Sequence, residues 1–311
     1  MEFVKDIEEY SAQIIDLAYK KYTEEMSYHA CATKKTKQGF EQFLNTKMNG
    51  INGIVGVDEG KVCGFLLYAL REAGEIYCDI PVWGYGADGK DSIKTISRLF
   101  QHLAKNLVLD KKVCFSVRLY AHDEEVQKLF SFMQFGIQSE KGIRHVEKTE
   151  HTSKYKIREL SKKEVEQKWK EIWWILLRLI AHLQESPVFY PGYEFTEEGY
   201  KAFFADSGTR VFAAMDKESL IGLIEANSEN IWYLSSDIPI LNVGEIYVDP
   251  EYRGKKLAQA LLHCVDLALQ VDGVEYEWVE HGTANPTARG FWNKYFETME
   301  YEFVRMIERL R

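Results

Sequence analysis

The sequence predicts an α/β protein in which two domains of one type follow each other along the chain. Its 311 residues exceed the roughly 100–200 residues of a usual domain. The segment Gly-Glu-Ile-Tyr-Cys-Asp at 74–79 returns as Gly-Glu-Ile-Tyr-Val-Asp at 244–249, with five of six residues identical. In both halves a strand hairpin precedes alternating strands and helices, which indicates two mixed α/β domains.

Two weaker matches extend the repeat. Val-Cys-Gly-Phe-Leu at 62–66 resembles Leu-Ile-Gly-Leu-Ile at 220–224. Further along, Leu129-Phe130 corresponds loosely to Gly290-Phe291. Matches in one order at similar spacing favour two copies of one domain over chance.

The elements of each copy follow from apolar periodicity and turn residues. In the first copy we expect strands at 53–57, 62–70, 75–80 and 113–120, and helices at 92–109 and 124–133. In the second we expect strands at 155–160, 209–215, 220–226, 243–248, 274–279 and 301–308, and helices at 165–183, 256–271 and 286–296. The polar stretch 147–154 lacks periodicity and is interpreted as a linker, which gives domains at 1–148 and 154–311.

Composition narrows the class of protein. The net charge of −9 argues against nucleic-acid binding. Five cysteines without a C-x-x-C spacing predict neither a disulfide framework nor a cysteine zinc site, so we expect a cytoplasmic protein. The polar start is no signal peptide. The apolar run 172–177 is too short to span a membrane and is interpreted as a buried helix face.

The segment 244–258 carries the most chemical information. A strand ends at Asp249-Pro250, and Arg253, Gly254, Lys255 and Lys256 precede an amphipathic helix. A helix N-terminus leaves backbone N–H groups free and binds phosphate oxygens. The alternative interpretation is a basic helix start on a solvated face.

This segment resembles motif A of the GNAT acetyltransferase superfamily, whose signature is Arg/Gln-x-x-Gly-x-Gly/Ala. Arg253 and Ala258 fill the first and last signature positions, and Lys256 stands in place of the central glycine. The resemblance implies that acetyl-CoA binds here. Its pyrophosphate would lie on the backbone from Arg253 to Ala258, through Gly254, Lys255, Lys256 and Leu257, beside Tyr247 and Val248 of the preceding strand.

A second segment supports the resemblance. Asn285 and Ala288 match the family's Asn-x-x-Ala-x-x-(apolar)-Tyr helix after the fifth strand, and Trp292 occupies the position of the tyrosine. The resemblance implies that Asn285 contacts the pantetheine arm. Trp292 replaces a tyrosine that acts as general acid in many members, and tryptophan has no ionisable hydroxyl. The implied fold is two tandem GNAT-like domains, each a mixed, mostly antiparallel sheet flanked by helices.

The first copy carries the pattern Gly-x-Gly-x-x-Gly at 84–89. Alone, this pattern suggests a dinucleotide site. However, it follows a hairpin, and Asp110 precedes the next strand instead of ending it. We interpret it as a flexible, degenerate motif A that lacks basic residues, and we expect no acetyl-CoA site in this copy.

For the catalytic groups, the resemblance implies an amine acceptor that attacks the acetyl-CoA thioester and therefore a general base. Glu245 is the first candidate, because burial would raise its pKa. The alternatives are Glu225, Asp237, Glu280 and His281, and Glu245 could instead point outward. Tyr295, Tyr247 or water would protonate the leaving thiolate, and the backbone N–H of Val248 would polarise the carbonyl.

The sequence does not identify the acceptor of the acyl group. Aromatic residues gather at Trp173, Trp174, Phe189, Tyr190, Tyr193 and Phe195, where an amine could stack, although ordinary packing also explains them. A small-molecule or peptide amine is expected as partner, with no metal, nucleic acid or membrane. The alternatives are a tandem transferase with another acyl donor and a non-catalytic acyl-CoA-binding or regulatory protein.

Overall fold

The computed structural model describes residues 1–29, 34–109, 111–147, 153–190, 195–229 and 240–308. Within it the chain divides into two compact units. Unit 1 holds the described residues of 1–141 and 297–311, and unit 2 holds those of 142–231 and 237–296. Each unit contains a mixed, mostly antiparallel sheet with helices against it, so the predicted fold class is confirmed.

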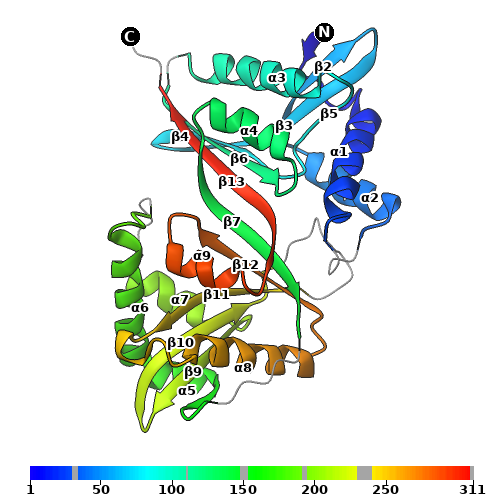
Figure 1. Ribbon diagram of the computed structural model, residues 1–311. Coiled ribbons are helices and arrows are strands. Elements are labelled where there is room, and N and C mark those ends of the chain that lie inside the picture. Colours follow the sequence, from blue (N-terminus) through cyan, green and yellow to red (C-terminus); the bar gives the residue numbers. More distant parts are fainter. Residues whose placement is uncertain (30–33, 110, 148–152, 191–194, 230–239, 309–311) are drawn as a thin grey trace. The chain divides into compact units, whose positions relative to one another are not determined.

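Unit 1 has the strand order β1-β2-β3-β4-β6-β13, with β5 paired to β3. Strands β4 and β6 pair in parallel, whereas β1 with β2, β2 with β3, β3 with β4 and β5, and β6 with β13 pair antiparallel. Helices α1 and α2 contact each other, as do α3 and α4 (Figure 1). Its elements are β1 (Glu2–Val4), α1 (Ser11–Met26), α2 (Lys37–Met48), β2 (Asn52–Asp58), β3 (Lys61–Ala73), β4 (Glu75–Ile80), β5 (Tyr85–Ala87), α3 (Ser92–Leu107), β6 (Val113–Tyr120), α4 (Glu124–Phe132) and β13 (Glu297–Ile307), and β7 (Gly136–His145) contributes residues to both units.

Unit 2 has the strand order β12-β11-β10-β9-β8, in which β11 and β12 pair in parallel and the other neighbours pair antiparallel. The predicted helix 165–183 is two helices that meet at Lys168. Its elements are β8 (Lys156–Leu160), α5 (Lys162–Gln167), α6 (Trp169–Gln184), α7 (Glu197–Ala205), β9 (Thr209–Asp216), β10 (Ser219–Asn227), β11 (Ile240–Val248), a short 3-10 turn (Pro250–Tyr252), α8 (Leu257–Val271), β12 (Tyr276–Gly282) and α9 (Pro286–Trp292).

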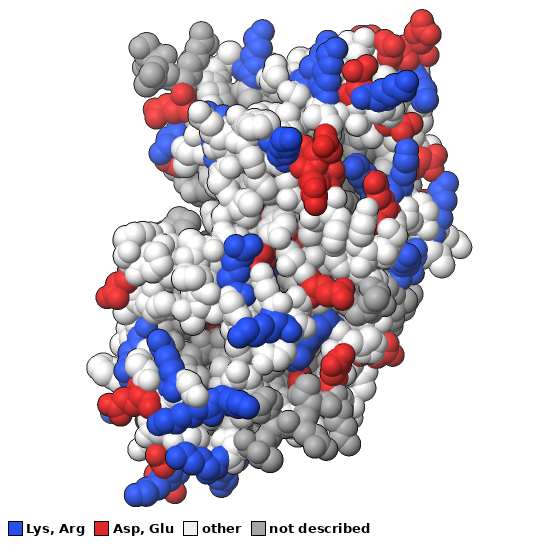
Figure 2. Space-filling model, in the orientation of Figure 1, with Lys and Arg blue, Asp and Glu red and all other residues white. Residues whose placement is uncertain are grey.

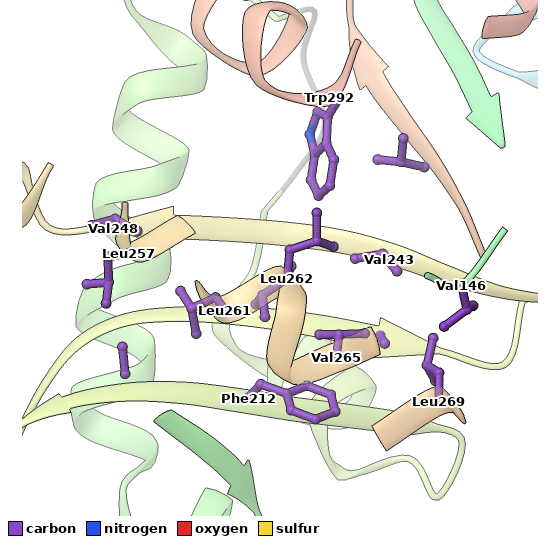
Figure 3. Packing of buried hydrophobic residues seen from close by; sticks show 14 of the residues in the cluster. Val146, Phe212, Val243, Val248, Leu257, Leu261, Leu262, Val265, Leu269 and Trp292 are labelled. Atoms are coloured by element: carbon purple, nitrogen blue, oxygen red, sulfur yellow. The ribbon is translucent and has the colours of Figure 1, made fainter. Parts of the chain in front are cut away.

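Alternation along β9 builds the core of unit 2 on both faces of its sheet. Phe212 and Ala214 pack with helix α8, whereas Val211, Ala213 and Met215 pack with helices α5 to α7. Figure 3 shows the first of these clusters, with Leu257, Leu261 and Val265 of α8 against the strands and Trp292 pointing into it from α9. The apolar face of α8 is therefore buried against the sheet, as the amphipathic pattern of 256–271 predicts.

The last strand of the chain, β13, does not belong to the domain that the sequence predicts for it. The sequence places 301–308 in the second domain, but β13 pairs antiparallel with β6, from Glu300 opposite Tyr120 to Ile307 opposite Val113. Ion pairs fix it there: Glu300, which is 1% exposed, lies 2.9 Å from both Arg118 and Lys141. The C-terminal strand thus completes the sheet of unit 1. The linker prediction at 147–154 falls largely outside the described residues.

Charged residues of both signs are interspersed on the face shown in Figure 2. None of the helices in the described ranges is long and apolar enough to cross a membrane. The apolar run of α6 buries Ile172, Ile175 and Leu176, while Trp174 stays 62% exposed. The described cysteines Cys63, Cys78, Cys114 and Cys264 are free.

Candidate active site

A break in strand pairing creates the candidate site in unit 2. Strand β11 contains an extra residue opposite β10, because the register shifts between Ile224 and Ala226. On its other side, parallel pairing with β12 runs from Ile240 to Asn242, and over the described residues it extends no further. A bulge bends its strand and re-aims side chains. The two strands separate beyond Asn242, and a cavity of about 710 Å³ lies there.

Two glutamates from neighbouring strands line this cavity. Glu225 of β10 is 2% exposed and accepts a 3.2 Å hydrogen bond from the backbone N–H of Glu245. Burial raises the pKa of Glu225 to about 8, and the charge of Glu245 adds to that rise. Burial also raises the pKa of Glu245. The pair therefore titrates closer to neutral pH than ordinary carboxyls, as a general base requires.

Gly244 allows the carboxylate of Glu225 to lie close to the backbone of β11. A Cβ at this position would lie 2.0 Å from Oε1 of Glu225, well inside van der Waals contact. Asn227 supports Glu225 from the other side, with Nδ2 donating to Oε2 at 3.3 Å. The glycine of the repeated hexapeptide thus has a specific packing reason in this copy.

Tyr200 is a site residue that the sequence pattern did not reveal. It lies on α7, lines the cavity and donates a 2.9 Å hydrogen bond to Oε1 of Glu245. This bond favours the charged form of Glu245 and opposes the effect of burial on its pKa. Thr196, which caps α7, and the glutamates of its first turn were the available signals for this helix.

Two residues of the predicted phosphate-binding segment have left-handed backbone conformations. Gly254 has φ +75° with nothing near its Cβ position, and Lys256 has φ +58°. The left-handed value explains why glycine is expected at the position of Lys256. The Lys256 side chain is exposed, and no side chain caps α8. The first turn of α8 therefore keeps its backbone N–H groups for an anion.

Two arginines form hydrogen bonds with the end of β11, just before this turn. Arg253 donates from Nε to the carbonyl of Val248 at 3.0 Å, and its guanidinium lies 5.2 Å from the Tyr247 ring centroid. Arg178 of α6 donates to both carboxylate oxygens of Asp249, at 2.7 and 3.3 Å. Arg178 was not singled out from the sequence, because its partner lies far along the chain.

The second predicted segment lies at the same cavity. Asn285 is buried, and its Oδ1 accepts a 3.1 Å hydrogen bond from the N–H of Ala288, so its side chain caps α9. Trp292 is 2% exposed and belongs to the core, yet its edge lines the cavity. Tyr295 packs against the same core, with the Arg144 guanidinium 5.8 Å from its ring centroid, and is not among the lining residues.

The cavity thus brings together most of the predicted site. Its lining includes Glu245, Tyr247, Val248, Arg253, Ala258, Asn285, Ala288 and Trp292, together with the alternative bases Glu225, Glu280 and His281. Gly254, Lys255, Lys256 and Leu257 lie in the adjoining turn and helix start instead. Of the aromatic group, Tyr190 and Phe195 line the cavity, while Trp174 and Phe189 are largely exposed. Asp237 and Tyr193 lie outside the described residues.

The glycine pattern of unit 1 has a different structure from the flexible loop that we expected. Tyr85–Ala87 forms strand β5 on β3, and Tyr85 is 1% exposed. A Cβ at Gly84 would lie 2.7 Å from the carbonyl oxygen of Leu67, and one at Gly86 would lie 2.7 Å from the Phe65 ring. These glycines permit close packing of the backbone.

Comparisons with known proteins agree with this arrangement. Residues 173–297 match the model of the acetyltransferase (GNAT) family. None of the curated proteins matches the sequence.

Solved structures extend the likeness to the whole chain. A tandem GNAT protein from the clavulanic acid biosynthesis pathway has 13% identity and a TM-score of 0.50, covering 100% of this chain and 99% of its own. A GCN5-related N-acetyltransferase from Sphaerobacter thermophilus has 11% identity and a TM-score of 0.55, covering 96% and 92%. A fungal GCN5-related glucosamine N-acetyltransferase region has 12% identity and a TM-score of 0.54, covering 98% of this chain and 38% of the multi-domain protein. The chain therefore has the fold of tandem GNAT proteins, and its residues 173–297 match the GNAT acetyltransferase family.

Proposed function

We propose that the protein is an N-acyltransferase that moves the acetyl group of acetyl-CoA to a primary amine in the cavity of unit 2. One observation carries the proposal. The same cavity is lined by buried Glu225 and partly buried Glu245, both with raised pKa, and by the end of the strand that leads into an uncapped helix. The glutamates would supply a general base for the amine, and the start of the helix would bind acetyl-CoA beside it.

The residues present fit the donor. The first turn of α8 has no side-chain cap, and Gly254 leaves open space at its Cβ position. Arg253 and Lys255 add positive charge near this turn, which suits a pyrophosphate. Asn285 and Ala288 line the neighbouring wall, where the pantetheine arm would lie.

Glu245 acts as the general base in this proposal. It removes a proton from the bound ammonium group, so that the neutral amine attacks the thioester carbonyl and expels the thiolate of CoA. Burial raises the pKa of Glu245. Glu225 accepts a hydrogen bond from the backbone N–H of Glu245, and Tyr200 holds the carboxylate of Glu245 in place through a hydrogen bond. A raised pKa strengthens the carboxylate as a base at neutral pH.

The remaining roles fall to groups at the strand end. The backbone N–H of Val248 polarises the thioester carbonyl. Tyr247 lines the cavity, so its hydroxyl or water returns a proton to the thiolate. Trp292 has no ionisable hydroxyl. Tyr295 is not among the residues that line the cavity, so we assign this step to Tyr247 or water.

The proposal is tested by release of CoA from acetyl-CoA in the presence of a panel of amines. The panel contains small amines, amino sugars and peptides with free N-termini, and a thiol reagent detects CoA. We expect amine-dependent CoA release by the wild type, together with a product heavier by one acetyl group. Binding of acetyl-CoA without release on any amine would favour a binding or regulatory protein, and release only from longer acyl-CoA would change the donor.

A further inference from the structure

A cluster of side chains that could bind a metal lies in unit 1, and none of its residues lines the cavity of unit 2. Glu25 lies in the last turn of α1, His29 follows four residues later, and His122 lies in the connection between β6 and α4. Oε1 of Glu25 lies 2.8 Å from Nε2 of His29 and 2.9 Å from Nδ1 of His122. The three ligand atoms lie within 4.8 Å of one another.

The surrounding structure orients this cluster. The other carboxylate oxygen of Glu25 accepts a 3.1 Å hydrogen bond from the backbone N–H of His122, which directs Oε1 to the two rings. The His122 ring stacks on Tyr28, with centroids 4.2 Å apart. Glu25 and His29 are 2% and 3% exposed. Such fixed side chains lose little freedom when they bind an ion.

The second ring nitrogen of His29, Nδ1, also bears on metal binding. Its Nδ1 is buried and makes no hydrogen bond to any part of the chain that the structure describes. Oε2 of Glu297 lies 3.4 Å from this nitrogen, slightly beyond a good hydrogen bond. Histidines that bind a metal through one nitrogen usually donate the other N–H to a carboxylate. Glu297 is placed for that role.

We propose that Glu25, His29 and His122 bind a divalent transition-metal ion of the zinc type. Oε1 of Glu25, Nε2 of His29 and Nδ1 of His122 are the ligands, a set that zinc accepts at about 2.0–2.2 Å. Binding requires the proton of His29 to reside on Nδ1, from which it is donated to Glu297. The His122 side chain is 39% exposed, so water reaches the fourth position. The ion would join α1 to the β6–α4 connection within unit 1.

Calorimetric titration of the full-length, tag-free, chelator-treated protein with Zn²⁺ tests this site. We expect one ion per chain and a rise in melting temperature on binding. His122→Ala removes a partly exposed ligand and should abolish both effects. Glu297→Gln should weaken affinity about 10- to 100-fold, as for other partners of ligating histidines. His102→Asn, which removes a histidine elsewhere in unit 1, should leave binding unchanged.

Two controls distinguish loss of the metal site from misfolding and from zinc binding elsewhere in the chain. Circular dichroism and melting without metal show whether His122→Ala folds; if it does not, Glu25→Gln, which keeps the shape of the side chain, takes its place. Unchanged zinc affinity in the folded ligand variant would place the ion elsewhere, for example on cysteines, and would overturn the proposal. Absence of zinc binding to the wild type would overturn it as well.

Discussion

The segments β4–α3 of unit 1 and β11–α8 of unit 2 share nearly the same six residues, at 74–79 and 244–249, but form different structures. In unit 1, β4 pairs in parallel with β6 from Ile76 to Ile80. In unit 2, the described pairing of β11 with β12 stops at Asn242, before the repeated hexapeptide begins. The repeat therefore shows that pairing with the next strand, and not the hexapeptide itself, decides whether a cavity opens.

Glu75 and Glu245, which occupy the same position in the two hexapeptides, have different surroundings. Glu75 forms a 2.7 Å ion pair with Lys112 and is 34% exposed in its side chain. Glu245 instead accepts a hydrogen bond from Tyr200 and lines a cavity beside buried Glu225. Burial raises the pKa of Glu245, whereas Glu75 is held in a partly exposed ion pair. The presence of Glu75 in the first copy thus does not weaken the assignment of Glu245 as base.

The largest expected effect comes from removing the base. Glu245→Gln should lower kcat about 10²- to 10⁴-fold, while acetyl-CoA affinity should stay unchanged because the proposed donor site is formed by other residues. Glu75→Gln, the same change in unit 1, should leave kcat unaltered. Steady-state kinetics with the best amine of the panel measures both. An equal loss in the two variants, or a Glu245→Gln enzyme with unchanged pH–rate profile, would remove Glu245 from the mechanism.

The second prediction concerns pH. The raised pKa of Glu225, about 8, means that the folded state holds a proton that the unfolded state has released. Stability should therefore fall as pH rises from about 4.5 to 8. Glu225→Gln should be more stable than the wild type at pH 8 by up to a few kcal/mol and should lose less stability over this range. Urea unfolding at several pH values measures the difference, and identical pH dependence in both proteins would contradict it.

Gly244→Ala gives the third effect. Its Cβ meets Oε1 of Glu225 at 2.0 Å, so the variant should lose about 1–3 kcal/mol of stability and most of its activity. Gly74 has nothing near its Cβ position but a φ of +75°, so Gly74→Ala should cost stability without affecting kcat. Comparable kcat in the two variants would show that the close approach at Gly244 has no part in the site.

The smallest effect tests the turn before α8. Lys256→Gly should gain about 1 kcal/mol of stability, because glycine adopts the left-handed φ of +58° without strain. Asp91, at the start of α3, has a φ of −99°, so Asp91→Gly should not stabilise the protein. Denaturant midpoints of both variants make the comparison, and a destabilised Lys256→Gly would contradict it.

The sequence predicted local features well and long-range pairing poorly. The strand at 75–80 and the motif A turn follow from side-chain period and turn chemistry, which are local. That 301–308 completes unit 1 depends on partners such as Arg118 and Lys141, which no local pattern reveals. For the same reason Tyr200 was missed, since its role arises only when α7 meets β11. Helices α1 and α2 lacked an apolar stripe strong enough to be recognised, and the proposed metal cluster joins residues far apart in the chain.

Calorimetric titration of acetyl-CoA into the wild type, Arg253→Glu and Lys90→Glu tests whether unit 2 binds the donor. Arg253 precedes α8, and Lys90 occupies the comparable exposed place before α3. We expect one site per chain, lost in Arg253→Glu and retained in Lys90→Glu. Binding that survives Arg253→Glu and disappears in Lys90→Glu would place the donor in unit 1 and would show that the proposed site in unit 2 is wrong.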